Sequence, residues 1–188
     1  SGSTCLTKQI RIDGKAASAY VCVTGLGLYR FFVNGEKAGD DEMTPGWTSY
    51  HKHLCYQTYD VTALLKEGEN TLQAMLGAGW YKGKMGFLLR RNNYGTRTAF
   101  LMQLTVRYED GREEVFVTDN SWQGRPGPVT FSEIYDGEHY DARLERESMR
   151  FDVGETDPEP GDRSTNTGEA DPASEDRSTN TGEADPVS

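Results

Sequence analysis

Hydrophobic and polar residues alternate in short runs along most of residues 6–118, and turn-forming residues separate the runs. The clearest run is 16–24, in which Tyr20, Cys22 and Thr24 share one face and Val21 and Val23 the other. A period of two residues is typical of a β-strand with two different faces. The same reasoning predicts strands at 6–12, 28–33, 36–38, 53–59, 71–77, 100–108 and 113–118, a last apolar stretch at 129–135, and one helical turn at 63–66.

Turn signals indicate how these strands connect. Asn34-Gly35 favours a two-residue hairpin, because both residues tolerate the positive φ angles of a type I′ turn. Glu109-Asp110-Gly111 predicts a second hairpin, and residues 124–128 are expected to form a loop. Short strands with a turn every eight to twelve residues or so, without strand–helix alternation, are typical of an antiparallel sandwich. The sequence therefore predicts an all-β fold, an antiparallel β-sandwich of the jelly-roll type.

The charge of the chain changes after residue 150. The formal net charge is −10; residues 1–150 hold 19 acidic and 18 basic residues, and residues 151–188 hold 11 acidic and two basic residues. The segment DRSTNTGEADP occurs at 162–172 and again at 176–186, and it contains no large apolar side chain. Such a segment cannot bury enough surface to offset its conformational entropy. We expect a β-sandwich domain at 5–150 and a disordered, repetitive acidic tail or linker at 151–188.

Composition also bears on partners and compartment. Neither part of the chain carries a basic stripe, so no nucleic-acid partner is expected. No apolar run is long enough to cross a membrane, so no membrane partner is expected either. Cys5, Cys22 and Cys55 have no metal-type spacing and are predicted to be buried free thiols. Ser1-Gly2-Ser3, without an initiating Met or a signal peptide, is typical of a cloning remnant at residues 1–4, and it gives no localisation for the parent protein.

A metal site is one candidate for chemistry. Asp40, Asp41 and Glu42 lie together in a loop bounded by glycines. Adjacent carboxylates beside backbone carbonyls are typical of Ca²⁺ sites, because Ca²⁺ binds several oxygens in flexible geometry. Asn92 and Asn93, in a second loop bounded by glycine, are suited to complete the shell. The alternative interpretation is a solvated acidic turn that holds no metal.

Aromatic residues beside glycines are a second candidate, for binding a sugar. They are Trp47, Trp80, Tyr81 and Tyr94. A flat ring presented by a loop stacks well on the apolar C–H face of a sugar. Asn93 adds an amide that both donates and accepts hydrogen bonds. This mixture suits a neutral polyol, whereas the alternative for each ring taken alone is packing in the core.

The sequence offers little for catalysis. Asp136, Glu138 and Asp141 suggest an acid/base pair of the kind that hydrolyses glycosides. However, carboxylates two residues apart on an extended segment diverge, and nothing supplies the enclosed pocket that raises the pKa of one of them. His51 and His53 lie at strand spacing, but no third zinc ligand is indicated. We therefore expect no catalytic residue in this chain.

Many of these candidates lie in one continuous segment, LYRFFVNGEKAGDDEMTPGWTSYHKHLCYQTYDVTALLKEGENTLQAMLGAGWYKG. It is followed in order by RRNNYGTR, VTDNSW and IYDGEHYDARLE. This combination resembles the accessory N-terminal β-sandwich of bacterial α-L-rhamnosidases, glycoside hydrolase family 78, over about residues 5–146. In those enzymes a separate helical barrel carries out catalysis. The resemblance therefore implies a non-catalytic domain, excised from such an enzyme, whose partner is that barrel.

The resemblance also implies a ligand. Some members of this group are carbohydrate-binding modules of family 67, which hold L-rhamnose through a bound Ca²⁺. For this chain it implies binding of terminal L-rhamnose or rhamnose-containing glycans, with Asp40, Asp41 and Asn92 as metal ligands and Trp80, Tyr81, Asn93, Tyr94 and Trp47 around the sugar. Relatives often carry Asp where this chain has Ser49, so one carboxylate is missing here. The alternative function is purely structural, a domain that packs on the catalytic barrel and binds no sugar.

Overall fold

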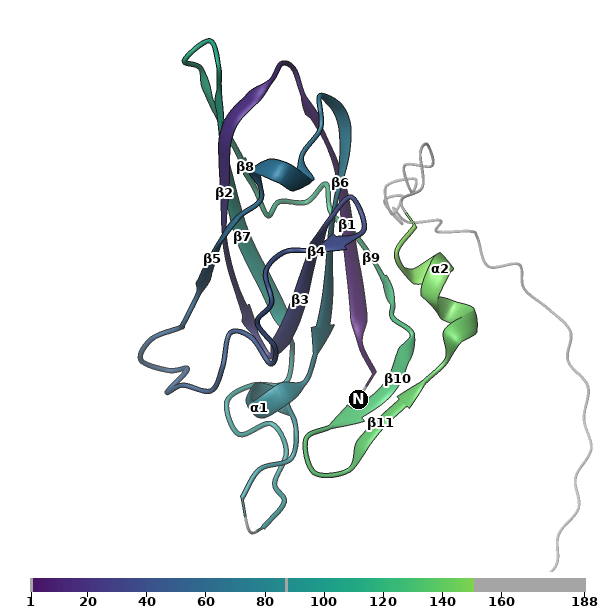
Figure 1. Ribbon diagram of the computed structural model, residues 1–188. Helices are drawn as coiled ribbons and strands as arrows, with labels where there is room; N and C mark the ends of the chain where they lie inside the picture. The colour runs from purple at the N-terminus through teal and green to yellow at the C-terminus, as the bar shows by residue number, and fades with distance from the viewer. Residues whose placement is uncertain (1, 87, 151–188) are drawn as a thin grey trace, which may run out of the picture. The chain divides into compact units, whose positions relative to one another are not determined.

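The computed structural model describes residues 2–86 and 88–150, and within them the chain forms two packed β-sheets, a separate hairpin and short helices (Figure 1). The strands are β1 Thr4–Ile12, β2 Ala16–Leu26, β3 Leu28–Val33, β4 Glu36–Lys37, β5 Gln57–Asp60, β6 Gly68–Gly77, β7 Ala99–Tyr108, β8 Glu113–Val117, β9 Gln123–Pro126, β10 Val129–Glu133 and β11 Gly137–Tyr140. The helical segments are η1 Thr62–Leu64, α1 Gly79–Lys82, η2 Ala142–Leu144 and α2 Glu145–Ser148. The acidic tail predicted at 151–188 lies outside the described residues.

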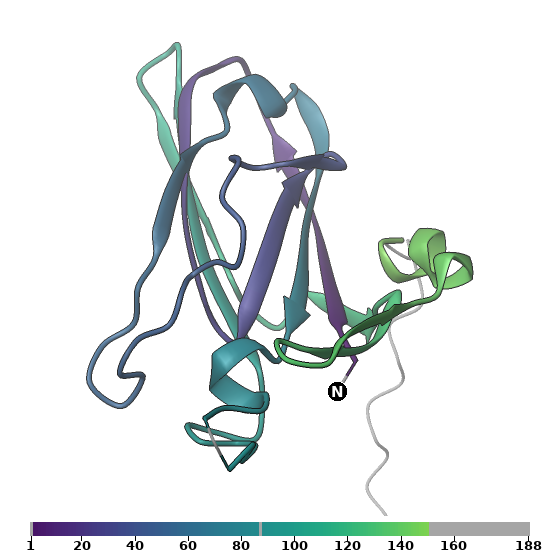
Figure 2. The same ribbon diagram turned by 60° about the horizontal axis from the view of Figure 1, so that its bottom comes forward.

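The two sheets are antiparallel throughout. One has the strand order β4-β3-β6-β1-β9 and the other the order β5-β2-β7-β8, while β10 and β11 pair only with each other. Figures 1 and 2 show the sheets face to face, with α1 at one end of the sandwich. The prediction of an all-β antiparallel sandwich is confirmed. In the part of the chain that the structure describes, no helix is long and apolar enough to span a membrane.

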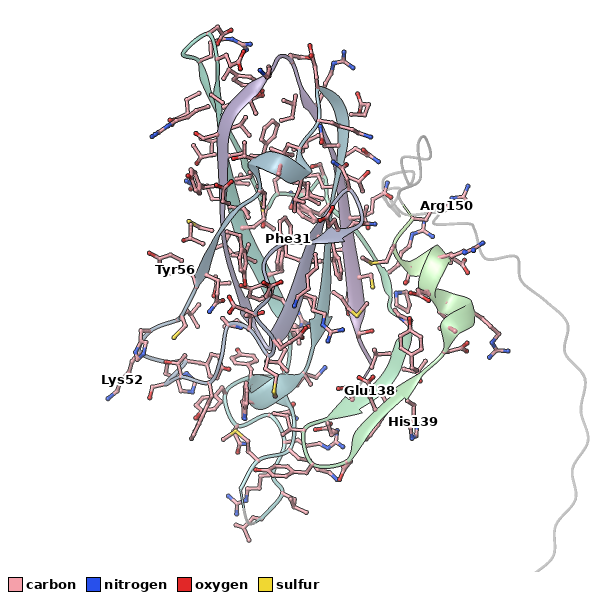
Figure 3. The ribbon with its side chains drawn as sticks, viewed as in Figure 1. Phe31, Lys52, Tyr56, Glu138, His139 and Arg150 are labelled. Atoms are coloured by element: carbon pink, nitrogen blue, oxygen red, sulfur yellow. The ribbon has the colours of Figure 1, made fainter. Side chains whose placement is uncertain are left out.

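The hydrophobic core fills the space between the two sheets. Val21 and Val23 of β2 are fully buried, as their alternation with Tyr20 predicts, and Tyr20 itself is exposed. From the facing sheet Phe31 of β3 enters the core and stacks on Phe100 of β7, with 6.0 Å between ring centroids (Figure 3). Removing such side chains from water is the main favourable contribution to folding.

The Asn34-Gly35 turn connects β3 to β4 as predicted, with positive φ angles of 53° and 84°. The Asn34 side chain also reaches β6. Its amide nitrogen donates to Asn70 Oδ1 at 2.8 Å, and its own Oδ1 accepts from the Thr71 N–H at 3.0 Å. One residue therefore both forms the hairpin turn and connects it to a neighbouring strand.

Asn70 is buried near the start of β6 and uses its full hydrogen-bonding capacity. Its Oδ1 accepts from Asn34 Nδ2 at 2.8 Å and from the Lys66 N–H at 2.9 Å. Its Nδ2 donates to the carbonyl oxygens of Lys66 at 2.6 Å and Gly68 at 2.9 Å. Asn70 thus holds together the hairpin turn after β3 and the turn that leads into β6.

The structure corrects several predicted strands. Residues 124–128 were expected to be a loop, but β9 runs through Pro126 and pairs with β1. Gly124 and Pro126 discourage a strand, yet β9 is an edge strand, where proline is tolerated. In the stretch 53–59 only Gln57 onward is strand, and β10 ends at Glu133 rather than 135 because β11, which was not predicted, pairs back onto it.

Helices and the first residues also differ from expectation. The helical turn predicted at 63–66 is the 3-10 turn η1, which starts at Thr62 because the Asp60 carboxylate accepts from the Thr62 N–H at 2.9 Å. The sequence did not reveal α1, η2 or α2, since segments of three or four residues show no helical period. Ser3 exchanges backbone hydrogen bonds with Val129 and Gly127, so the folded part includes residues 3 and 4.

The cysteines are free, as predicted, but their predicted burial is wrong for two of the three. Cys5 is buried, Cys55 is half-buried and Cys22 is exposed. The reason lies in the period of β2. Val21 and Val23 point into the core, so the side chain between them points to solvent.

The domain is expected to lose stability in acid. The Lys8 ammonium, with help from Ser121, lowers the pKa of Asp119 to about 2, and Arg143 lowers the pKa of Asp141 to about 2. A folded-state pKa below the unfolded value of about 3.9 gives stability that is complete above that value and is lost as the pH falls toward 2. The thermal midpoint should therefore fall between about pH 4 and pH 2, and less so in Asp119→Asn than in the control Glu36→Gln. Equal acid sensitivity of the two variants would contradict the assignment to Asp119.

Candidate functional site

An aromatic cluster forms at the end of the sandwich that carries α1. We define it as Trp47 and Tyr50, from the loop between β4 and β5, with Tyr81 of α1 and Tyr94 of the following segment. The Tyr50 ring centroid lies 5.1 Å from that of Tyr81 and 4.9 Å from that of Tyr94. The Trp47 indole N–H donates to the Tyr94 hydroxyl at 3.1 Å. His51 lies beside Tyr94, with ring centroids 5.7 Å apart.

Backbone contacts fix the two segments that carry the cluster. The Thr44 carbonyl accepts from the Tyr29 N–H of β3 at 2.9 Å, and the Thr44 hydroxyl donates to the Tyr29 carbonyl at 2.8 Å, which holds the loop before Trp47 against the sheet. After α1 the chain folds back, because the Tyr94 N–H donates to the Tyr81 carbonyl at 3.3 Å. Gly95 is required here, since a Cβ at this position would collide with the Tyr81 hydroxyl. The rings are therefore held by loops that are themselves anchored.

The cluster has a buried base and an exposed rim. Tyr50 is buried, and burial, with the nearby Tyr94, raises the pKa of its hydroxyl to about 12. The hydroxyl therefore stays protonated and donates to the Gly46 carbonyl at 3.2 Å. Trp47 is 58% exposed. The arrangement presents the Trp47 indole to solvent, with its N–H bonded to Tyr94, whose ring packs on the buried Tyr50.

Three of the five predicted sugar-binding residues, Trp47, Tyr81 and Tyr94, are brought together in the cluster. Asn93 lies in the same segment and donates from Nδ2 to the Arg90 carbonyl at 3.0 Å. Trp80 is half-buried on α1, and no ring contact joins it to the cluster among the described residues. The sequence analysis missed Tyr50. The only feature of the sequence that could have indicated it is its position shortly after Pro45-Gly46-Trp47.

One carboxylate of the acidic loop, Glu42, is paired with cations of the protein itself. Lys37 donates to the Asp41 carbonyl at 2.7 Å and to Glu42 Oε1 at 2.8 Å, and Arg30 pairs with Glu42 Oε2 at 2.9 Å. Hydrogen bonds from Lys37 and Arg30 lower the pKa of Glu42. Asp40 and Asp41 are exposed. Glu42 and one loop carbonyl are therefore not available to a metal without displacing an ion pair.

The predicted calcium ligands come from two segments of the chain, the loop after β4 and the segment after α1. Asn92 lies at a positive φ of 60°, and its N–H donates to the Lys82 carbonyl at 2.9 Å. Within residues 2–86 and 88–150, no group of three or more His, Cys, Asp or Glu side chains is placed to hold a metal. Asp40, Asp41 and Asn92 as joint ligands of a calcium ion stay a prediction.

A buried carboxylate anchors the segment that carries Tyr94. The Glu133 side chain is fully buried, and its Oε1 pairs with Arg91 Nη1 at 2.5 Å. Its Oε2 accepts from the Lys84 N–H at 2.7 Å. Gly83 leaves the space for this carboxylate, since a Cβ there would lie 2.9 Å from Oε2. Lys84 also pairs with Asp136, so β10 and its turn hold the segment after α1 in place.

Comparison with known proteins identifies the family. A family model described as the α-L-rhamnosidase N-terminal domain matches residues 14–160. The chain belongs to this family. An α-L-rhamnosidase from Streptomyces avermitilis is 40% identical to this rhamnosidase domain over 146 residues, which is 77% of the chain and 14% of the relative. One from Formosa agariphila is 38% identical over 141 residues, 74% of the chain and 15% of the relative. The resemblance to the N-terminal rhamnosidase domain that the sequence indicated is confirmed, whereas the similarity to carbohydrate-binding modules of family 67 stays a prediction.

Solved structures give the same result. The α-L-rhamnosidase from Aspergillus terreus has a TM-score of 0.76 and 41% identity, and the match covers 79% of this chain and 17% of that one. The Streptomyces avermitilis enzyme, solved in complex with L-rhamnose, has a TM-score of 0.74 and 39% identity over 77% of this chain and 14% of that one. The chain thus spans about one seventh of the length of the curated relatives it matches.

Proposed function

We propose that this domain is a non-catalytic part of an α-L-rhamnosidase and that its aromatic cluster binds terminal L-rhamnose. The supporting observation is the exposed Trp47 indole, which Tyr94 holds by a hydrogen bond. A ring that is already ordered loses little conformational entropy when it stacks on a sugar. The relative from Streptomyces avermitilis was solved with L-rhamnose, which makes this the first sugar to test.

The proposed binding mode combines an apolar stacking contact with hydrogen bonds to the sugar hydroxyls. The Trp47 ring covers the apolar edge of the sugar near its 6-methyl group. The Tyr94 hydroxyl accepts from Trp47, so its own proton is free to donate to a sugar hydroxyl. Asn93, in the same segment, supplies an amide at the rim. A monosaccharide buries little surface, so we expect a Kd on the order of tens of micromolar to millimolar.

The carboxylates support the non-catalytic part of the proposal. Glycoside hydrolysis needs one carboxylic acid whose pKa is raised. Asp141 instead pairs with Arg143, which lowers its pKa to about 2. Asp136 pairs with Lys84, and the buried Glu133 pairs with Arg91. Each of these three acids is thus the partner of a cation.

Replacing Trp47 with alanine is expected to weaken L-rhamnose binding at least about tenfold, which is about 1.4 kcal/mol. Isothermal titration calorimetry at high protein concentration measures the difference. Tyr20→Ala removes an exposed aromatic ring on β2, outside the cluster, and should leave the affinity unchanged. Absence of heat with the unmodified chain would contradict the proposal that the domain binds L-rhamnose. Equal affinity of the Trp47 and Tyr20 variants would show that the sugar binds outside the aromatic cluster.

Calcium stays a prediction that the same titration can test. The binding mode above is built on Trp47, Tyr94 and Asn93 and involves no metal. If Asp40, Asp41 and Asn92 form a calcium site, Ca²⁺ should increase the affinity for L-rhamnose and EDTA should reverse the increase. Asp41→Asn should then abolish the calcium effect. An affinity that is the same in Ca²⁺ and in EDTA would remove calcium from the proposed function.

A further inference from the structure

The two sheets of the sandwich differ in what covers their outer faces. On β1 the side chains of Cys5 and Thr7 point away from the core, yet both are almost fully buried, and so is Gln73 of β6. The C-terminal part of the described chain covers them. Gln73 Nε2 donates to the Met149 carbonyl at 2.5 Å, just after α2. Figure 1 shows β10, β11 and α2 on this side of the sandwich.

The outer face of the other sheet has no such cover within the described residues. Its outward positions form rows across the strands, because Cys22 pairs with Gln103 and Gln103 with Val117 in the strand register. We call the following outward residues the bare face: Tyr20, Cys22, Thr24, Thr58, Leu101, Gln103, Thr105, Val115 and Val117, with Tyr56 at the start of β5. In Figure 3 Tyr56 lies on the outer side of β5, away from Phe31.

The bare face carries exposed apolar side chains among neutral polar ones, and the Arg107–Glu113 ion pair borders it. Leu101 is 59% exposed, and Val115 and Val117 are also exposed although they are β-branched aliphatic residues. A shallow hollow of about 350 Å³ lies here, lined by Cys22, Thr24, Tyr56, Leu101, Gln103 and Val117 among others. A contiguous exposed apolar patch of this kind marks an interaction surface more often than it marks plain solvent-facing surface.

We propose that the bare face packs against an apolar surface of the adjoining part of the parent rhamnosidase chain. In the relatives about six sevenths of the protein lies outside the region that matches this domain. A patch of ten residues is small, since a stable complex of separate proteins uses roughly 20–30 residues on each side. Two surfaces in one chain need fewer interface residues to stay associated, because the linker raises their effective concentration. The size of the patch therefore favours a partner in the same chain over a second copy.

This interface is independent of the proposed sugar site. The aromatic cluster lies on the loops at the end of the sandwich, while the bare face covers the strands of one sheet. Docking through the strands leaves Trp47 open to solvent. The inference rests on family membership and on the exposed apolar surface, and it stands or fails separately from rhamnose binding.

Cys22 is a native probe of the interface, because its thiol is exposed in the middle of the bare face. A maleimide reagent should modify Cys22 rapidly in the 188-residue chain and at least about tenfold more slowly in the full-length rhamnosidase that carries this domain. A cysteine introduced by Glu36→Cys, on β4 of the other sheet, should react equally fast in both proteins. Peptide mass spectrometry separates the Cys22 signal from those of Cys5 and Cys55.

Substitutions of residues in the bare face complete the test. Leu101→Glu and Val117→Lys, both at exposed positions, should restore fast Cys22 labelling in the full-length enzyme without altering labelling in the shorter chain. Equal Cys22 reactivity in both unmodified proteins would overturn the proposal. Slow labelling of the shorter chain would also overturn it. If sedimentation then shows a dimer that Leu101→Glu dissociates, the occupant is a second copy.

Discussion

Glu133→Ala is expected to lower the free energy of unfolding by about 3 kcal/mol, the lower end of what breaking a buried ion pair costs. The lower value applies because the Arg91 side chain is partly exposed, so its guanidinium can reorient toward solvent when Glu133 is removed. The Lys84 N–H, however, loses its acceptor in a site that stays partly buried. Urea denaturation monitored by far-UV circular dichroism measures the loss.

The same substitution should loosen the segment that carries Asn93 and Tyr94, two of the proposed sugar-binding residues. The amide hydrogens of Asn92 and Tyr94 donate to carbonyls of α1, and their exchange should become faster in Glu133→Ala. Glu133→Gln keeps an acceptor for Lys84 and should be intermediate. Asp136→Asn removes a more exposed partner of Lys84 and should cost less than about 1 kcal/mol. If Glu133→Ala costs no more than Asp136→Asn, Glu133 is not the anchor of this segment.

Asn70→Asp is the second substitution with a large expected effect, again about 3 kcal/mol at neutral pH. The change alters the shape of the side chain very little. It replaces Nδ2, which donates to the carbonyls of Lys66 and Gly68, with an oxygen that faces the same two carbonyls. Two buried acceptors lose their donor, and a carboxylate is buried beside them.

The loss should depend on pH in a defined direction. Burial among acceptors raises the folded-state pKa of the introduced carboxylate above its unfolded value of about 3.9. The destabilisation is then full at neutral pH and shrinks as the pH falls below the folded-state pKa, because the protonated acid can donate to one carbonyl. Asn93→Asp makes the same change at an exposed position and should cost within about 0.5 kcal/mol. A destabilisation of Asn70→Asp that is constant from pH 3 to pH 7 or so would contradict this account.

Local patterns in the sequence were sufficient for the sandwich core. Val21, Val23 and the Asn34-Gly35 turn each obey a rule that depends on neighbouring residues alone. The pattern failed where pairing is decided by distant partners. β9 contains Gly124 and Pro126, and only the unsatisfied edge of β1 makes it a strand.

For the candidate site, too, the sequence predicted only what local patterns contain. Trp47, Tyr81 and Tyr94 stand beside glycines, which is a local signal for loop aromatics, and the structure brings them together. The metal set stays a prediction, because the approach of the acidic loop to Asn92 depends on how distant segments fold together. Lys37 of β4 and Arg30 of β3 pair with Glu42 of that loop, a constraint that no local pattern contains.

The position of β1 in its sheet has a consequence for how the domain is made. Thr4 pairs with Leu76 on one side and with Pro126 on the other, so its partners follow it by 72 and 122 residues. At about 5–20 residues per second, β1 waits on the ribosome for several seconds or longer before β6 is available. Until β9 follows, one edge of β1 presents unpaired N–H and C=O groups. The first strand of this domain is thus among the last to gain both neighbours, and we expect a chain shortened before β9 to aggregate through the open edge of β1.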